Sequence, residues 1–359
     1  MKKLAVVLVL MLAAAGAVFA QNDLQVLTVV NYNKSESITV KQLKARCEIY
    51  EKQMGKKLSA DERKMVLKSL VDEKLVLQAA AKAGLTIPDS TIDQYFLQTM
   101  NAQIGQNLTE KELNDLIMKQ EGVSLDTLLK KQVGMNVAEY KVYLKNQLIA
   151  QQYVVQQKKD DIEKQVATDD EIRKFYNGNK ASFVWNDMIK VFMVIVPKGK
   201  DPDAAKNKLS TLRNAYVNKS KTIEQFYNEC KVEGAGYQAG ELLVPITELT
   251  AMQIGMSYDK LLSMNGQSVG YVSNVEETAA DYRFLTIEKK YAAKMLSLTD
   301  PVQPDNKATV YDYIKAQLTQ QKQMLYVQQA AIDITKTLNT PAYVTEKKSG
   351  EELNKLLNW

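Results

Sequence analysis

No histidine occurs among the 359 residues of the chain. Without an imidazole, the chain can form neither a Ser-His-Asp triad nor a Cys-His pair, and it has no histidine to bind zinc or to change charge near neutral pH. The absence therefore excludes the hydrolases and zinc enzymes that depend on this side chain.

Cysteine is almost as scarce as histidine. Cys47 and Cys230 are the two cysteines of the chain. Two are too few for a disulfide framework, so the fold must depend on its hydrophobic core. The pair is able to form a disulfide in an oxidising compartment, and two separate thiols are the simpler interpretation.

A large excess of charge and the common cofactor motifs are also missing. Without its first 20 residues, which hold two lysines and no acid, the chain has 45 basic and 42 acidic residues, a net charge of +3. This balance is too even to favour nucleic acid or an anionic membrane as a partner. Gly234 and Gly236 lack the Lys-Ser/Thr ending of a phosphate loop, and the acidic pairs at 160–161 and 169–170 are typical of helix caps and surfaces. We therefore predict no cofactor and no metal site.

The first 20 residues have the pattern of a signal peptide. Lys2 and Lys3 precede an apolar run over residues 4–17, and small or aliphatic residues lead up to Ala20. The run is short for a membrane span, and no later stretch is long and apolar enough to be one. We expect cleavage near Ala20 and a soluble, exported protein in the periplasm or another extracytoplasmic space. An uncleaved signal anchor is the alternative.

Residues 41–166 are predicted to be almost entirely helical. Ser59 with Glu62 and Thr109 with Glu112 have the spacing of capping boxes, each followed by apolar residues at helical intervals. After Pro304 the chain returns to helix, over about residues 306–338. The apolar stripe expected on this helix comprises Val310, Tyr313, Ile314, Leu318, Leu325, Ala330 and Ile334.

Between these helical parts the pattern changes to mixed helix and strand. Thr168 and Glu171 form a third capping box. Residues 188–196 and 282–288 have the pattern of strands, and a further strand is expected at 269–273. Glycines 234, 236 and 240 indicate a loop. The predicted fold class is α+β, predominantly α. A helical lobe from residues 21–166 and 300–359 would hold an inserted α+β domain at 168–291.

Two motifs of the chain are LKSLVDEKLVLQAAAKAGLTI at residues 67–87 and TDDEIRKFYNGNKASF at 168–183. Together with residues 29–43, they resemble the secreted chaperone and peptidyl-prolyl isomerase family that includes SurA and PrsA. The resemblance implies that the helical lobe is a SurA-like chaperone domain and that residues 168–291 form a parvulin-like domain.

Within the parvulin-like segment, the scaffold motifs resemble the family but the active-site residues do not. MVIV at 193–196 falls where the family has HILV, and AGEL at 239–242 falls near its GGDLG. NGQSVGYV at 265–272 and DYRFLTIEKK at 281–290 also fall near motifs of the family. This alignment places Met193 and Arg283 where the family has histidines, with Cys230 or Glu233 nearest to its acid or thiol. A thioether hardly forms hydrogen bonds and a guanidinium only donates them, so the resemblance implies a degenerate catalytic site.

Three functions are compatible with this interpretation of the sequence. The first is an ATP-independent holdase chaperone whose partners are unfolded exported or outer-membrane proteins. The second is an active peptidyl-prolyl isomerase with an atypical pocket, and the third is a cell-envelope scaffold or adhesin. Neither the peptide-binding residues nor the oligomeric state follows from the sequence.

Overall fold

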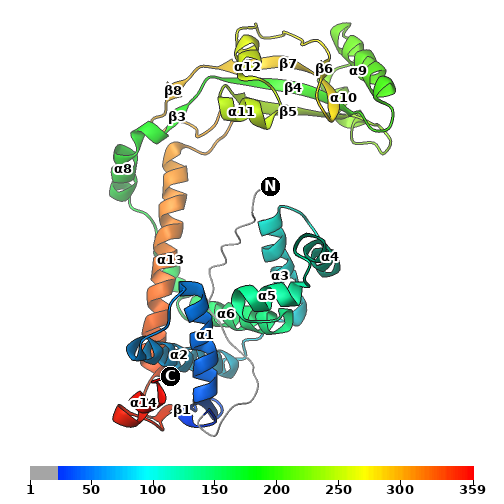
Figure 1. The fold of residues 1–359 in the computed structure, drawn as a ribbon. Helices are drawn as coiled ribbons and strands as arrows, with labels where there is room; N and C mark the ends of the chain where they lie inside the picture. Colours follow the sequence, from blue (N-terminus) through cyan, green and yellow to red (C-terminus); the bar gives the residue numbers. More distant parts are fainter. Residues whose placement is uncertain (1–22) are drawn as a thin grey trace. The chain divides into compact units, whose positions relative to one another are not determined.

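The computed structural model describes residues 23–359, so the signal peptide predicted at 1–20 lies outside the described residues. Contacts divide the chain into two units (Figure 1). The first unit comprises the residues up to Val166 together with Gln321–Trp359, and the second comprises Ala167–Gln320. The fold is α+β and mainly helical, as predicted.

The first unit consists of helices and one small sheet. Its elements are β1 (Val26–Val30), β2 (Glu36–Thr39), α1 (Val40–Met54), α2 (Ala60–Lys82), α3 (Asp89–Ile104), α4 (Glu110–Glu121), α5 (Leu125–Val133), α6 (Val137–Gln157), α7 (Lys159–Glu163), the C-terminal part of α13 (Val310–Leu338), β9 (Val344–Glu346) and α14 (Gly350–Leu356).

Local capping sets where these helices begin. The predicted boxes of Ser59 with Glu62 and of Thr109 with Glu112 are confirmed, because in each the cap side chain accepts from the backbone three residues on and the glutamate accepts in return. Thr39 caps α1 in the same way with Gln42. Four of the helices end at a glycine in the left-handed conformation, which satisfies their last carbonyl groups at little steric cost.

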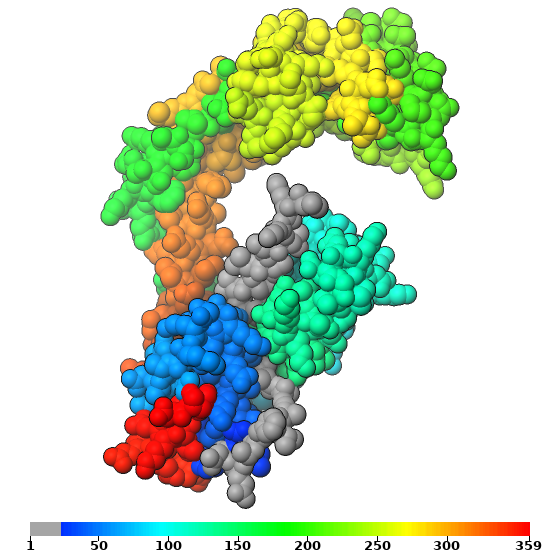
Figure 2. Space-filling model, viewed as in Figure 1, coloured from blue at the N-terminus to red at the C-terminus, as the bar shows by residue number. Residues whose placement is uncertain are grey.

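The C-terminal segment completes the sheet and core of the first unit. β9 pairs antiparallel with β1, and β1 pairs antiparallel with β2, giving the order β2-β1-β9. Leu357, at the end of α14, is fully buried in one cluster with Leu27, Leu43 and Leu75. Figure 2 shows this last segment, in red, lying against the N-terminal helices, in blue. A second cluster joins α3, α4, α5 and α6 around Phe96, whose side chain is also fully buried.

The second unit is built on a four-stranded antiparallel sheet in the order β5-β4-β7-β6. Its elements are α8 (Asp169–Gly178), a 3-10 turn (Lys180–Ser182), β3 (Val184–Trp185), β4 (Met188–Pro197), α9 (Pro202–Val217), α10 (Ile223–Glu229), β5 (Gln238–Pro245), α11 (Glu248–Gln253), α12 (Tyr258–Asn265), β6 (Glu276–Glu277), β7 (Asp281–Tyr291), β8 (Lys294–Met295) and the first turns of α13.

The two faces of this sheet carry separate cores, because successive side chains of a strand point to opposite faces. On β4, Phe192 and Val194 join the aromatic cluster under α9 and α10. Val191 and Met193 join the aliphatic cluster under α11 and α12. Each helix pair therefore covers one face (Figure 1).

Two strand predictions were wrong. Residues 238–245, in which Gly240 was taken to mark a loop, form β5, which pairs with β4 along its whole length. Residues 269–273 are not a strand, and only Val272 forms an isolated bridge, with Thr286. β5 lies at the edge of the sheet and is partly exposed, so its residues lack the apolar alternation of a half-buried strand.

The second unit extends beyond the predicted end at residue 291. A small core joins Ala167, Ile172 and Phe183 to Leu296, Val310 and Ile314. The Trp185 indole Nε1 also donates to the carbonyl of Val302, at 3.0 Å. These contacts place residues 292–320 with the sheet domain, whereas the sequence assigned 300–320 to the helical lobe.

Helix α13 contributes a different face to each unit, which the single predicted stripe did not anticipate. It begins at Val310, and Val310 and Ile314 are buried in the second unit. Ala330 is buried in the first unit's part of the helix. Positions 20 residues apart lie about 200° apart around an α-helix. Tyr313 and Leu325, which the stripe included, are 52% and 58% exposed.

The cysteines are free thiols, with Cys47 in the first unit and Cys230 in the second. Among the helices of residues 23–359, none combines the length and hydropathy needed to cross a membrane.

Candidate functional site

The structure brings two of the four predicted site residues to one face of the sheet in the second unit. Met193 lies in the middle of β4, opposite Gly240 of β5 and Leu285 of β7. Arg283 lies on β7, two residues before Leu285 and opposite Ile195. Both face α11 and α12, and each is 8% exposed.

Arg283 is tied to the turn between α11 and α12. Its Nη1 donates to the carbonyl of Ile254 at 2.8 Å, and its Nε lies 3.4 Å from Oδ1 of Asp281. A Cβ at Gly255 would lie 3.5 Å from Nη2, so the guanidinium packs closely under this turn. Since a guanidinium has donors only and one of them is directed to a backbone carbonyl, Arg283 acts here as a clasp between strand and turn.

Met193 gives this face an apolar floor. Its side chain belongs to the cluster that includes Leu261, Met264 and Leu285. A thioether is a weak acceptor and donates nothing, so Met193 can only pack. The face therefore offers an apolar surface and a fixed cation.

Cys230 and Glu233 do not lie with Met193 and Arg283. Cys230 follows α10, and its Sγ is 3.4 Å from the carbonyl of Tyr227. It packs against the aromatic cluster on the opposite face of the sheet. Glu233 is exposed in the turn that follows α10. The sequence named these two residues for their position in the chain. Cys230 follows α10, which covers the face of the sheet opposite to Met193, so the cysteine lies apart from Met193 and Arg283.

A pocket of about 430 Å³ lies in the first unit, where the β1–β2 turn meets α1, α2 and α6. Sequence reasoning did not find it. Its wall from α2 follows one helix face, since Leu70, Glu73, Lys74, Leu77, Gln78 and Ala81 have helical spacing. The sequence feature that indicates the pocket is the presence of Glu73, Lys74 and Gln78 on an otherwise apolar face of α2.

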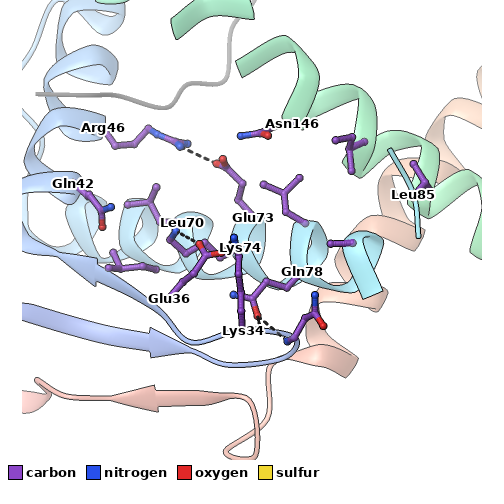
Figure 3. A pocket seen from close by; sticks show the side chains of 15 residues that line it. Lys34, Glu36, Gln42, Arg46, Leu70, Glu73, Lys74, Gln78, Leu85 and Asn146 are labelled. Carbon is purple, nitrogen blue, oxygen red and sulfur yellow. Dashed lines mark hydrogen bonds and ion pairs between the residues drawn. The ribbon is translucent and has the colours of Figure 1, made fainter. Parts of the chain in front are cut away.

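Charged side chains from three elements meet in this pocket (Figure 3). Arg46 of α1 pairs with Glu73 of α2, with 2.8 Å between Nη2 and Oε2. Glu36 of β2 accepts from two lysines, Lys74 at 2.6 Å and Lys34 at 2.9 Å. Three cations thus face two carboxylates.

Burial and charge act in opposite directions on the two carboxyl groups. Burial raises the pKa of Glu73, and the charge of Arg46 and its hydrogen bond only partly offset this effect. Burial also acts to raise the pKa of Glu36, but the hydrogen bonds and charges of Lys74 and Lys34 outweigh it and lower the pKa overall. Glu36 is therefore held as a carboxylate by its two lysines.

Gln78 shapes the rim of the pocket. Its Oε1 accepts from the backbone N–H groups of Tyr32, Asn33 and Lys34, at 2.8, 3.0 and 3.4 Å. One buried side chain thereby holds the β1–β2 turn over α2, which places Lys34 beside Glu36.

Residues 3–123 match the family model of the SurA-like N-terminal domain. By this match, residues 3–123 are similar to a SurA-like N-terminal domain. The match confirms the resemblance seen in residues 67–87. All residues that line the pocket lie within the SurA-like N-terminal domain, except Asn146 and Ile149 of α6.

The chain is also similar to one curated protein and to several solved structures. The foldase protein PrsA of Clostridium acetobutylicum is 25% identical over 222 residues, which cover 61% of this chain. The matched region spans 59% of that relative's length. Among solved structures, a SurA-like chaperone of Campylobacter jejuni aligns with 90% of this chain and 99% of its own, at 16% identity and a TM-score of 0.32. PrsA of Streptococcus pneumoniae aligns with 90% of this chain and 95% of its own, at 14% identity and a TM-score of 0.29.

Proposed function

We propose that the protein is an ATP-independent chaperone that holds unfolded exported polypeptides, and that its second unit is a parvulin-like domain without efficient isomerase activity. The SurA-like N-terminal domain and the PrsA relative support the chaperone class. The signal peptide predicted at residues 1–20 supports a place of action outside the cytoplasm.

The observation that carries the proposal is the clasp of Arg283. By the sequence alignment, Met193 and Arg283 occupy the positions of the family's histidines. Rotation about the peptide bond has a barrier of about 18–20 kcal/mol, so an isomerase requires a pocket that stabilises the twisted amide. A buried thioether is only a weak acceptor, and the guanidinium of Arg283 accepts nothing and already donates to the carbonyl of Ile254, so neither side chain reproduces the hydrogen bonding of a histidine. Of the functions left, the family match and the PrsA relative favour binding of polypeptide over a scaffold.

Exposed apolar side chains support binding of unfolded chains. In the first unit, Met65 is 64% exposed, and Leu325 and Ile332 are 58% and 59% exposed. Leu325 and Ile332 lie seven residues apart on α13, hence on one side of that helix. Flexible apolar side chains suit a surface that accepts many partners.

The test is suppression of aggregation by the full-length protein without ATP. Two unrelated denatured clients are diluted into buffer with a several-fold molar excess of the protein, and light scattering is followed. We expect scattering to fall for both clients. Unchanged scattering for both would reject the holdase and favour a scaffold.

A proline-limited exchange assay tests the second half of the proposal. We expect the full-length protein to accelerate cis–trans exchange in a proline peptide little or not at all. Turnover comparable with that of active parvulins, and lost in Arg283→Met, would establish an isomerase with an atypical pocket instead.

A further inference from the structure

The pocket of the SurA-like N-terminal domain combines apolar walls with charge. Its volume of about 430 Å³ lies in the range of small-molecule sites, about 300–1,000 Å³. The apolar part of the wall comes from β2, α2, the turn after α2, and α6. It comprises Ile38, Leu70, Leu77, Ala81, Leu85 and Ile149.

The charges in this pocket leave one cation in excess. Lys34 and Lys74 share the single carboxylate of Glu36, while Arg46 and Glu73 pair with each other. The Arg46 side chain is 3% exposed and the Lys74 side chain 23%, so water screens them less than surface charges. An anionic group in the pocket would restore the balance.

Two buried donors in the pocket wall have no acceptor. Nε of Arg46 and Nε2 of Gln78 are buried, and within the described chain neither has a hydrogen-bond partner. Buried donors without an acceptor are rare in folded proteins because each costs free energy. Both belong to residues that line the pocket and are at most 3% exposed. An oxygen atom of a ligand would supply the acceptor that these two donors lack.

We propose that this pocket binds a peptide carboxylate that lies beside an apolar side chain. The carboxylate lies among Arg46, Lys74 and Lys34, and the apolar side chain packs against the wall formed by α2 and α6. This assignment names the part of a client that the first unit takes, so it rests on the proposed function. A chain-terminal carboxylate and the side chain of an internal glutamate share this chemistry.

Binding of labelled tetrapeptides to the full-length protein tests the proposal by fluorescence anisotropy at low ionic strength. One peptide ends in phenylalanine with a free carboxylate, the second is its amide, and the third is an amide with glutamate before the phenylalanine. We expect the free acid to bind about fivefold or more tightly than the simple amide, because a charge-assisted hydrogen bond is lost in the amide. If the glutamate peptide binds as well as the free acid, the side chain can supply the carboxylate; if it binds like the simple amide, the chain end is required.

Three substitutions separate the pocket from a general effect of charge. Lys74→Gln removes a cation from the pocket and should weaken binding of the free acid about fivefold. Glu36→Gln releases two lysines and should tighten it, which partial unfolding cannot imitate. Lys68→Gln is the matched control on the same helix, since Lys68 is 70% exposed, pairs with Asp72 and does not line the pocket.

Equal binding of acid and amide overturns the proposal, and so does a Glu36→Gln variant that binds the acid no more tightly. Circular dichroism of each variant confirms that the helices are intact. If aggregation is suppressed but the peptides do not distinguish acid from amide, the pocket assignment fails and the holdase stands. If the acid binds as expected but clients still aggregate, the holdase fails and the carboxylate site stands.

Discussion

Arg63 should be among the most important charged residues for the stability of the first unit. Its side chain is 6% exposed, Nη1 donates to the carbonyl of Leu357 at 2.6 Å, and Nη2 lies 3.5 Å from Oε1 of Glu51. The Trp359 ring also covers the guanidinium, with 4.4 Å between Cζ and the ring centre. One side chain thus joins α2 to α1 and to the end of the chain.

The loss in Arg63→Met can be bounded from these contacts. A hydrogen bond from a charged group is worth about 1.5–3 kcal/mol, and breaking a buried ion pair costs about 3–5 kcal/mol. Glu51 keeps the ion pair with Lys57 and the N–H of Leu58, so the second cost applies only in part. Methionine retains most of the apolar contact with Trp359. We expect the free energy of unfolding of the first unit to fall by about 3 kcal/mol.

Urea denaturation of the full-length protein, followed by far-ultraviolet circular dichroism, measures this loss. Lys64→Met is the matched control, because Lys64 is the next residue of α2, its side chain is 42% exposed and it pairs with the exposed Asp61. The control should change stability by less than about 0.5 kcal/mol. Only the transition of the first unit should move. A loss below about 1 kcal/mol in Arg63→Met would refute the reasoning, because it would mean that Arg63 contributes no more than a surface pair.

Two further predictions concern titration and reactivity. Cys47 is fully buried, and burial raises the pKa of its thiol to about 12. A thiol reagent at pH 8 should therefore modify Cys230 in the native protein and Cys47 only after unfolding. Rapid modification of both thiols in the native protein would contradict this prediction. Hydrogen bonds from Lys56 and Ser59 lower the pKa of Glu62 from 4.5 to about 2. The contribution of Glu62 to the free energy of unfolding is therefore present above pH 4.5 and is lost as the pH falls through about 2. Glu62→Gln should make stability depend less on pH in this range of the acid-unfolding curve. An unaltered curve would count against the capping box.

Sequence reasoning succeeded where structure depends on neighbours along the chain. A capping box such as that of Ser59 and Glu62 is complete within four residues, so the helix start could be predicted. The clasp of Arg283 joins residues 29 positions apart, and nothing in the sequence pairs it with Ile254. The change of buried face along α13 also depends on which unit each half meets. The pocket was missed because Glu73 and Lys74 of α2 form their ion pairs with Arg46 and Glu36, which are distant in the sequence.

The position of β9 and α14 has a consequence for the order in which the protein matures. A chain is made and exported from its N-terminus, and contiguous domains fold as units. Residues 167–320 are contiguous and can fold once they have emerged, whereas the first unit waits for its closing strand and for Leu357, which is fully buried. A product truncated after residue 339 would keep a folded insert and leave the core of the first unit open. The part we propose to hold other unfolded chains should therefore form only after residues 344–357 have been made.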